Sequence, residues 1–202
     1  MNEERNRTWR EAVFKQRGTL LALPAVALVV FGRPSTRSVR VGVPIAFAGE
    51  ALRCWAVGYS GVTTRADHVT APRLVTAGPY AYVRNPLYLG NLITALGFTL
   101  AFTGAVAFPR RGTLMFGGLS AMLAIYAAIV PLEEAYLRQT FGEDFETYVT
   151  RVPRLVPRLS AAQPAIGSYD ASAIAHAETR TFLTFGAMLA GLAVKAARGA
   201  SR

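Results

Sequence analysis

Cysteine and histidine are scarce in this sequence of 202 residues, and their scarcity excludes several kinds of chemistry. The single cysteine, Cys54, rules out an intramolecular disulfide, and its place in an apolar run identifies it as a packing residue. The two histidines, His68 and His176, do not have the spacing of metal ligands, and the sequence has no nucleophile-elbow motif of a Ser-His-Asp enzyme. We therefore expect neither a metal site nor a covalent nucleophile.

Charged residues are also few, because Asp, Glu, Lys and Arg make up 17% of the chain while hydrophobic residues make up 52%. An ordinary soluble protein has about 25% charged residues. The length fits a single domain, residues 1–202, and the composition favours a lipid bilayer as its surroundings.

The sequence contains several long apolar runs with few charged residues. Such runs are candidates for membrane-spanning helices, each of which needs about 20 mostly apolar residues. We expect four such helices, over residues 18–32, 41–60, 87–108 and 113–132. No small-residue cleavage site follows the first run, so we interpret it as a retained helix rather than a signal peptide. The Pro-Arg-Arg-Gly corner at 109–112 predicts an antiparallel hairpin between the third and fourth helices.

A fifth apolar run, residues 181–197, is interrupted by Lys195 and allows three placements. It could span the membrane, lie along its surface, or pack beside the bundle. Residues 160–202 are thus a polar, Ala-rich connector followed by a possible C-terminal helix. The sequence predicts an all-α fold, a polytopic membrane bundle of four to five helices, in which Glu50 and Arg53 neutralise each other one helical turn apart.

The net charge of +10 raises the question of a nucleic-acid partner, but the distribution of the charge fits a membrane protein better. With the N-terminus in the cytoplasm, the outside loops of the four-helix core hold only five cations, which are Arg33, Arg37, Arg40, Arg110 and Arg111. The inside segments hold Arg5, Arg7, Arg10, Lys15, Arg17, Arg65, Arg73, Arg84, Arg138, Arg151, Arg154, Arg158 and Arg180. This asymmetry obeys the positive-inside rule. We predict a cytoplasmic N-terminus, polar chemistry gathered at the cytoplasmic face, membrane lipids as neighbours and no nucleic acid.

The most informative segment reads VTAGPYAYVRNPLYLG and lies directly before the third apolar run. Gly78 and the proline after it predict a tight turn that leaves backbone groups facing a bound molecule. Pro86 suits the first position of a helix, and Asn85 before it is biased away from helix. The amides at this helix start, together with Arg84, favour a carboxylate or a phosphate.

Three tyrosines of the same segment, Tyr80, Tyr82 and Tyr88, supply an aromatic wall for a flat ring. A simpler interpretation also fits them, namely a helix that begins at a proline and carries an interfacial aromatic belt. The segment alone does not separate the two.

A second polar cluster, Glu133 and Glu134, follows the fourth apolar run without a break. Glu134 lies one turn before Arg138, and we expect these two residues to pair. Glu133 lies one turn before the apolar Leu137 and has no local partner. A cationic ligand would supply one.

Beyond the carboxylates, Phe141 and Gly142 predict the end of the helix. Phe145, Tyr148 and Val152 then repeat at helical spacing and predict a short amphipathic helix on the membrane surface. The Val-Pro-Arg repeat that ends it fits either a basic tether to anionic headgroups or a segment that closes a pocket.

These pieces in order, Gly-Pro-Tyr, Arg-Asn-Pro-Leu-Tyr-Leu-Gly, Glu-Glu and Phe-Gly-x-x-Phe-x-x-Tyr-x-x-Arg-Val-Pro, resemble the isoprenylcysteine carboxyl methyltransferases and the related phospholipid methyltransferases. The resemblance covers residues 74–157. It implies a membrane enzyme that uses S-adenosylmethionine at its cytoplasmic face and takes a lipophilic small molecule or lipid-modified substrate from the bilayer. Candidate cofactor-binding residues are Leu74, Val75, Gly78, Tyr80, Arg84, Asn85, Pro86, Leu87, Tyr88, Glu133 and Glu134.

Within this resemblance, Arg84 and the helix start would hold the cofactor carboxylate, Glu133 its ammonium group, and the tyrosines its adenine. The family commonly has His where this chain has Asn85, and an amide hydrogen-bonds but carries no charge. Animal members have an arginine one turn before the glutamate, where this chain has Ile129. That departure removes a group expected to recognise a prenylcysteine carboxylate.

The acceptor decides whether a base is needed. A carboxylate is already deprotonated at neutral pH, whereas an amine must first lose a proton. The scarcity of histidine favours a carboxylate or thiol-derived acceptor, although Glu134 could serve as the base for an amine. Two other classes remain open, an NADPH-dependent membrane sterol-type reductase, which shares an Arg-x-Pro-x-Tyr step, and a non-catalytic membrane scaffold.

Overall fold

The protein, seen in a computed structural model, is described over residues 2–61 and 71–200. Its elements are α1 (Asn2–Phe31), α2 (Thr36–Ser60), the 3-10 turn η2 (Gly78–Ala81), α3 (Pro86–Thr103), α4 (Arg110–Phe141), α5 (Glu143–Arg151), α6 (Ser172–Ala177) and α7 (Thr179–Ala200). No strand occurs in these ranges, and the predicted all-α fold is confirmed. Arg65 and His68, which enter the charge and metal predictions, lie outside the described residues.

Five helices, α1, α2, α3, α4 and α7, are long and apolar enough to cross a membrane. The four core helices predicted from the sequence are all present, although α3 ends at Thr103 and α4 continues to Phe141. The fifth apolar run, for which the sequence allows three placements, forms α7 and meets the same length and hydropathy criteria as the other four. The chain is therefore a polytopic helical bundle.

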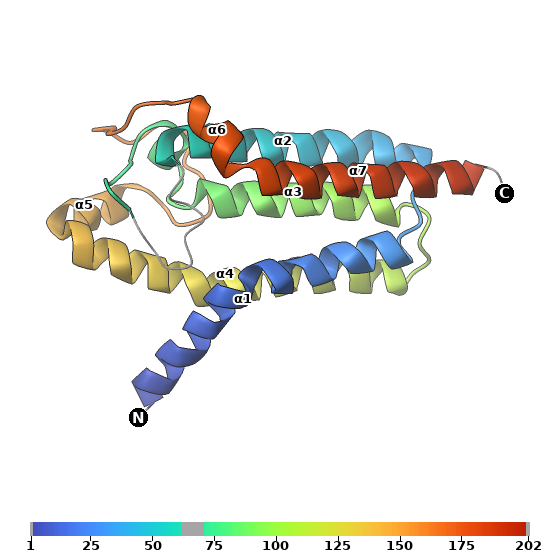
Figure 1. The fold of residues 1–202 in the computed structure, drawn as a ribbon, viewed down its shortest axis with the longest axis horizontal. Helices are drawn as coiled ribbons and strands as arrows, with labels where there is room; N and C mark the ends of the chain where they lie inside the picture. The colour runs from blue at the N-terminus through green and yellow to red at the C-terminus, as the bar shows by residue number, and fades with distance from the viewer. Residues whose placement is uncertain (1, 62–70, 201–202) are drawn as a thin grey trace.

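The helices form two layers. In Figure 1, α2, α3 and α7 lie side by side, and α1 and α4 lie together beneath them. The hairpin between α3 and α4 is present, but the chain turns at residues 104–109, and Arg110, Arg111 and Gly112 of the predicted corner already belong to α4. The end of α2, the start of α3 and the C-terminal part of α4 meet at one end of the bundle, and the short helices α5 and α6 cover that end.

Glycines allow α2 and α3 to pack closely along their whole length. A Cβ on Gly97 would collide with Ala46 and with the carbonyl of Gly42, so only a hydrogen side chain fits at this crossing. Near the site end, a Cβ on Gly90 would lie 2.7 Å from the Cγ of Arg53. Small residues at membrane helix contacts permit this approach, and here they make room for a buried arginine.

The C-terminal helix α7 belongs to the bundle. Its buried residues Phe185 and Met188 pack in one core cluster with Phe98 and Phe102 of α3. Lys195, which interrupts the apolar run, donates hydrogen bonds to the carbonyls of Val30 and Gly32 at 2.9 Å each. Because the last carbonyls of a helix lack partners within the helix, this lysine caps α1 from a neighbouring helix.

The helix after Gly142 differs from its prediction in one respect. Gly142 has φ of 52° and ends α4 as expected, and α5 follows. Its apolar side chains Phe145 and Tyr148, with Val152, are buried in a cluster with Ala162. The apolar face thus packs on the protein and not on the membrane surface, because residues 152–166 fold back beside it.

Candidate functional site

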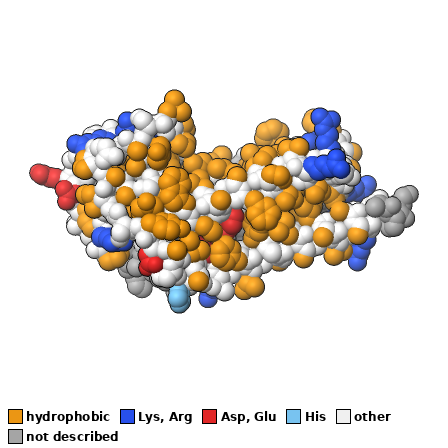
Figure 2. Space-filling view, turned by 90° about the horizontal axis from the view of Figure 1, so that it is seen from above, with side chains coloured by type: hydrophobic (Ala, Val, Ile, Leu, Met, Phe, Trp, Pro, Cys, Tyr) orange, Lys and Arg blue, Asp and Glu red, His pale blue; other side chains and the backbone are white. Residues whose placement is uncertain are grey.

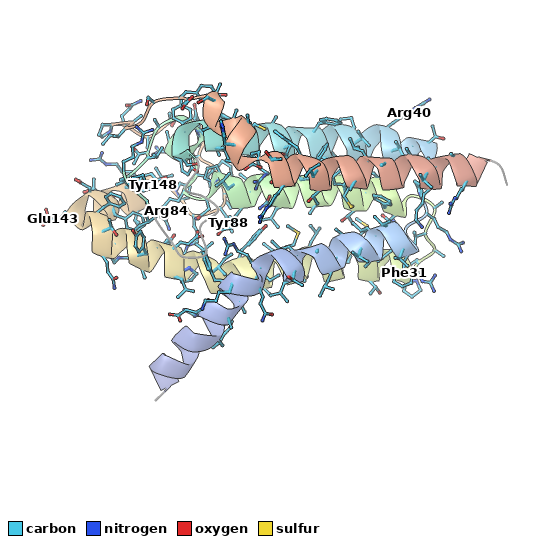
Figure 3. All side chains as sticks on the ribbon, viewed as in Figure 1. Phe31, Arg40, Arg84, Tyr88, Glu143 and Tyr148 are labelled. Atoms are coloured by element: carbon cyan, nitrogen blue, oxygen red, sulfur yellow. The ribbon has the colours of Figure 1, made fainter. Side chains whose placement is uncertain are left out.

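The candidate residues gather at the end of the bundle where α3 begins. In Figure 3, Arg84, Tyr88 and Tyr148 lie close together there, while Phe31 and Arg40 mark the opposite end. A cavity of about 660 Å³ occupies this place. It is lined by every candidate residue except Gly78 and Glu134, that is by Leu74, Val75, Tyr80, Arg84, Asn85, Pro86, Leu87, Tyr88 and Glu133.

The turn before α3 is shaped by Gly78, which does not itself line the cavity. Its φ of 61° is in the left-handed region, and a Cβ there would collide with the ring of Tyr59. Pro86 begins α3 at its first position, as predicted. The side chain of Asn85 does not cap the helix but donates to the carbonyl of Arg154 at 3.1 Å, which ties the loop to the chain after α5.

The aromatic wall differs in part from the prediction. Tyr80 and Tyr88 line the cavity, but Tyr82 does not, because its ring packs against Trp55 with ring centroids 6.3 Å apart. Tyr148 takes a place in the wall, and its hydroxyl donates to the carbonyl of Tyr80 at 2.8 Å. Burial raises the pKa of Tyr80 to about 12 and raises that of Tyr148 as well, so both remain neutral at physiological pH.

Glu133 projects from α4 into the cavity and meets α3. Its Oε1 accepts a hydrogen bond of 2.6 Å from the hydroxyl of Tyr88, whose ring lies 4.4 Å from that of Tyr126. The carboxylate that lacks a partner along its own helix is thus fixed by a neighbouring helix. Tyr88 leaves the other oxygen of Glu133 for a ligand or for another protein group.

Glu134 does not line the cavity, and it holds the loop in place. Its Oε1 accepts from Arg84 at 3.1 Å, and its Oε2 accepts from Arg154 at 2.5 Å. The predicted pair with Arg138 is wrong, because Arg138 instead donates to Glu146 of α5. Arg154 reaches Glu134 only because the chain after α5 folds back, and the Glu134 carboxylate raises the pKa of Arg154.

Arg84 is similarly engaged by the protein. Besides Glu134, its Nη1 donates to the carbonyls of Val149 at 3.0 Å and Val152 at 2.7 Å. Its side chain is 10% exposed. Arg84 therefore joins α5 to the loop, and these acceptors hold its guanidinium in place.

A second cavity, of about 800 Å³, adjoins the first and is mostly apolar. It lies among α1, α3, α4 and α7, and Glu50 of α2 also lines it. The two cavities share Leu21, Asn91, Tyr126, Thr181 and Thr184 in their linings. Figure 2 shows one face of the bundle, where hydrophobic side chains cover the middle and most Lys and Arg side chains lie toward the two ends. The polar cavity thus continues into an apolar one inside an apolar bundle.

Comparison with known protein families decides what kind of bundle this is. The model of the phospholipid methyltransferase family matches residues 38–144, which is more than half of the chain. The chain belongs to the phospholipid methyltransferase family. The resemblance inferred from residues 74–157 is confirmed, and the matched region begins earlier, within α2.

Curated relatives of this family member carry several names. The chain is 34% identical to protein-S-isoprenylcysteine O-methyltransferase of Schizosaccharomyces pombe over 54% of the chain and 45% of the relative. It is 34% identical to the cobalt-zinc-cadmium resistance protein CzcN of Cupriavidus metallidurans over 59% of the chain and 48% of the relative. It is 36% identical to methanethiol S-methyltransferase 1 of Bradyrhizobium diazoefficiens over 44% of the chain and 27% of the relative.

The chain spans about half the length or less of these three curated relatives. No solved structure matches it. Despite the metal-resistance name of one relative, the described residues contain no group of three or more His, Cys, Asp or Glu side chains that could hold a metal ion.

Several residues that line the cavity of this phospholipid methyltransferase family member escaped the sequence analysis. They are Phe14, Lys15, Arg17, Gly18 and Leu21 of α1, Arg53 and Asn91 of α2 and α3, and Glu178, Arg180, Thr181 and Thr184 of the C-terminal segment. Arg53 was visible in the sequence as a charge within an apolar run, and Lys15, Arg17 and Arg180 were counted there only among the cytoplasmic cations. The residues of α1 and of the C-terminal segment lie outside the matched region, so no family motif marks them.

Proposed function

We propose that this protein transfers a methyl group from S-adenosylmethionine to a lipophilic acceptor, an isoprenylcysteine-type carboxylate or a related lipid. One observation carries the proposal. The separated motifs predicted to bind the cofactor line a single cavity, and that cavity adjoins an apolar one. Family membership and the names of two relatives support methyl transfer as the reaction.

The polar cavity suits the cofactor in size and in chemistry. Its volume of about 660 Å³ lies within the range of roughly 300–1,000 Å³ that ligand pockets occupy. Its lining combines a carboxylate, Glu133, with the neutral hydroxyls of Tyr80 and Tyr88 and with several cations. S-adenosylmethionine supplies a methyl group on a positively charged sulfur, together with an ammonium group, a carboxylate and a flat adenine.

Each group of the lining has a role in this proposal. Glu133, held by Tyr88, pairs with the ammonium group of the cofactor. The carboxylate of the cofactor lies at the start of α3 in this proposal. The backbone amides of Leu87 and Tyr88 there have no partner within the helix, because they precede its first complete turn. Arg84 keeps the loop in position through Glu134, which replaces the direct role expected for it, and its charge still lies in the cavity wall.

Methyl transfer is an in-line displacement, so alignment in a dry site supplies most of the catalysis. The apolar cavity gives the acceptor tail a place beside the polar cavity. An acceptor carboxylate needs no base. Glu134 is withdrawn as a base for an amine acceptor, because it does not line the cavity and two arginines hold it.

The site lies on the cytoplasmic side in this proposal. The cations of the sequence support that orientation, since Arg17, Arg73, Arg84 and Arg180 all line the cavity end of the bundle. The same asymmetry accounts for the net charge without a nucleic-acid partner.

Titration calorimetry of the detergent-purified chain tests the proposal. We expect S-adenosylmethionine to bind and NADPH not to bind, and we expect membranes given methyl-labelled cofactor to yield a labelled lipid-soluble product. Binding of NADPH alone would establish the sterol-type reductase, which the family match does not favour. Binding of neither compound would favour the remaining alternative, a non-catalytic membrane scaffold.

A further inference from the structure

A buried cluster of charged and polar side chains links α2 to the C-terminal segment. The Nη2 of Arg53 donates to both carboxylate oxygens of Glu178, at 2.9 and 2.8 Å, and its Nη1 donates to Oδ1 of Asn91 at 2.5 Å. Glu50 lies one turn before Arg53 with 3.8 Å between Oε2 and Nε, and Thr181 lies 3.4 Å from Nη2. Glu178 is 1% exposed and the Arg53 side chain 10%. The sequence predicted only the contact between Glu50 and Arg53.

This cluster lies at the junction of the two cavities. Arg53 and Glu178 line the polar cavity, Glu50 lines the apolar one, and Asn91 and Thr181 line both. Among the residues that line the apolar cavity, Glu50 is the charged one. An acceptor whose tail lies in the apolar cavity and whose reacting group reaches the polar cavity must place its polar head against these side chains.

We propose that Arg53, Asn91 and Glu178 form the site that positions the polar head of the acceptor and selects among acceptors by the charge of that head. This inference rests on the proposed function. Glu178 competes with an anionic head for the Nη2 of Arg53, and it adds negative charge in a place of low dielectric constant, where unit charges interact more strongly than in water. Asn91 directs the other donor of Arg53.

The assignment gives the C-terminal segment a role in specificity. Glu178 follows α6 and lies outside residues 38–144, so this part of the acceptor site does not belong to the region matched by the family model. The residues proposed to hold the cofactor lie inside it. Because Glu178 is not among the residues proposed to hold the cofactor, a change there should alter the use of acceptors more than it alters cofactor affinity.

Two isosteric substitutions test the cluster in opposite directions. Glu178→Gln removes one negative charge and Asn91→Asp adds one, with little change in volume. The full-length protein in one detergent is titrated with hexadecanoate and with hexadecylamine, which share a tail and differ in the charge of the head. Because partition into the detergent is the same for every variant, the ratio of the two dissociation constants reports on the protein.

We expect Glu178→Gln to shift the ratio about tenfold toward hexadecanoate and Asn91→Asp to shift it toward hexadecylamine by a similar factor. The affinity for S-adenosylmethionine should change less in Glu178→Gln than the ratio does, because the proposed cofactor contacts are Glu133 and the start of α3. Glu143→Gln, on the exposed surface of α5, is the matched control and should leave the ratio unchanged.

If the cluster had only a structural role, Glu178→Gln would weaken the binding of both amphiphiles equally, and Asn91→Asp would not change the ratio of their dissociation constants. That result, with cofactor binding intact, would overturn the inference. Loss of cofactor binding in the unsubstituted protein would instead remove the proposed function, and the inference would fall with it.

Discussion

The two sides of the cavity differ in how the chain builds them. One side consists of the segment 74–88 and of Glu133. The segment is continuous in sequence, and Glu133 lies on α4, the helix that follows α3. On the other side, Arg53 and Glu178 are 125 residues apart and meet only through tertiary packing. The first side lies within the family region and carries the proposed cofactor contacts. The second joins Arg53, inside that region, to Glu178, outside it.

The largest expected effect concerns Glu134, which holds the loop at 78–85 through Arg84. In Glu134→Gln, Arg84 loses its carboxylate partner in a buried place, and Arg154 loses it as well. Breaking a buried ion pair by removing one partner costs about 3–5 kcal/mol. We expect a large fall in the melting temperature in detergent and weaker cofactor binding, because the loop at 78–85 is no longer fixed to α4.

The matched control for this prediction is Glu146→Gln. Glu146 also pairs with an arginine, Arg138, but both side chains are about half exposed. An exposed pair contributes about 0–1 kcal/mol, so this variant should melt close to the unsubstituted protein. Equal melting temperatures for the two variants would show that Glu134 does not hold the loop.

The second prediction separates binding from stability on the same side of the cavity. Glu133→Gln keeps an acceptor for the hydroxyl of Tyr88 but removes the charge proposed to meet the cofactor ammonium. A hydrogen bond to a charged group contributes about 2 kcal/mol, which corresponds to a loss of roughly thirtyfold in affinity. Calorimetry with S-adenosylmethionine measures the loss, and the melting temperature should hardly change. If the affinity stays the same, Glu133 does not contact the ammonium group.

The difference between the two sides also explains which parts of the site the sequence predicted. Pro86, Gly78 and the spacing of Glu133 constrain local backbone and helix faces, and local constraints are visible in sequence. The pairing of Glu134 was predicted wrongly, because Arg138 is its neighbour along the helix while Arg154 arrives by a fold in the chain. Nothing in the polar connector before α7 distinguishes Glu178 from a solvated residue.

The fold shows the same limit. Apolar runs predicted the four core helices, since length and hydropathy suffice for that purpose. The placement of α7 depended on side chains of other helices, such as Phe98 and Phe102, and on the carbonyls that Lys195 caps. A charge within an apolar run indicates a partner but does not say where in the chain the partner lies.

The smallest expected effect tests how firmly the C-terminal side is attached. Lys195→Met removes two hydrogen bonds from the carbonyls of Val30 and Gly32 but keeps an apolar side chain of similar length. A helix cap of this kind is worth about 1 kcal/mol, so the melting temperature should fall slightly. Arg40→Met, which removes an exposed cation at the same end of the bundle, is the control (Figure 3). Because α7 carries Thr181 at the junction of the cavities, Lys195→Met should weaken hexadecanoate and hexadecylamine equally and leave the affinity for S-adenosylmethionine unchanged. If the binding of only one amphiphile changed, the preference for one head charge would depend on the position of the whole helix α7 and not on Glu178 itself.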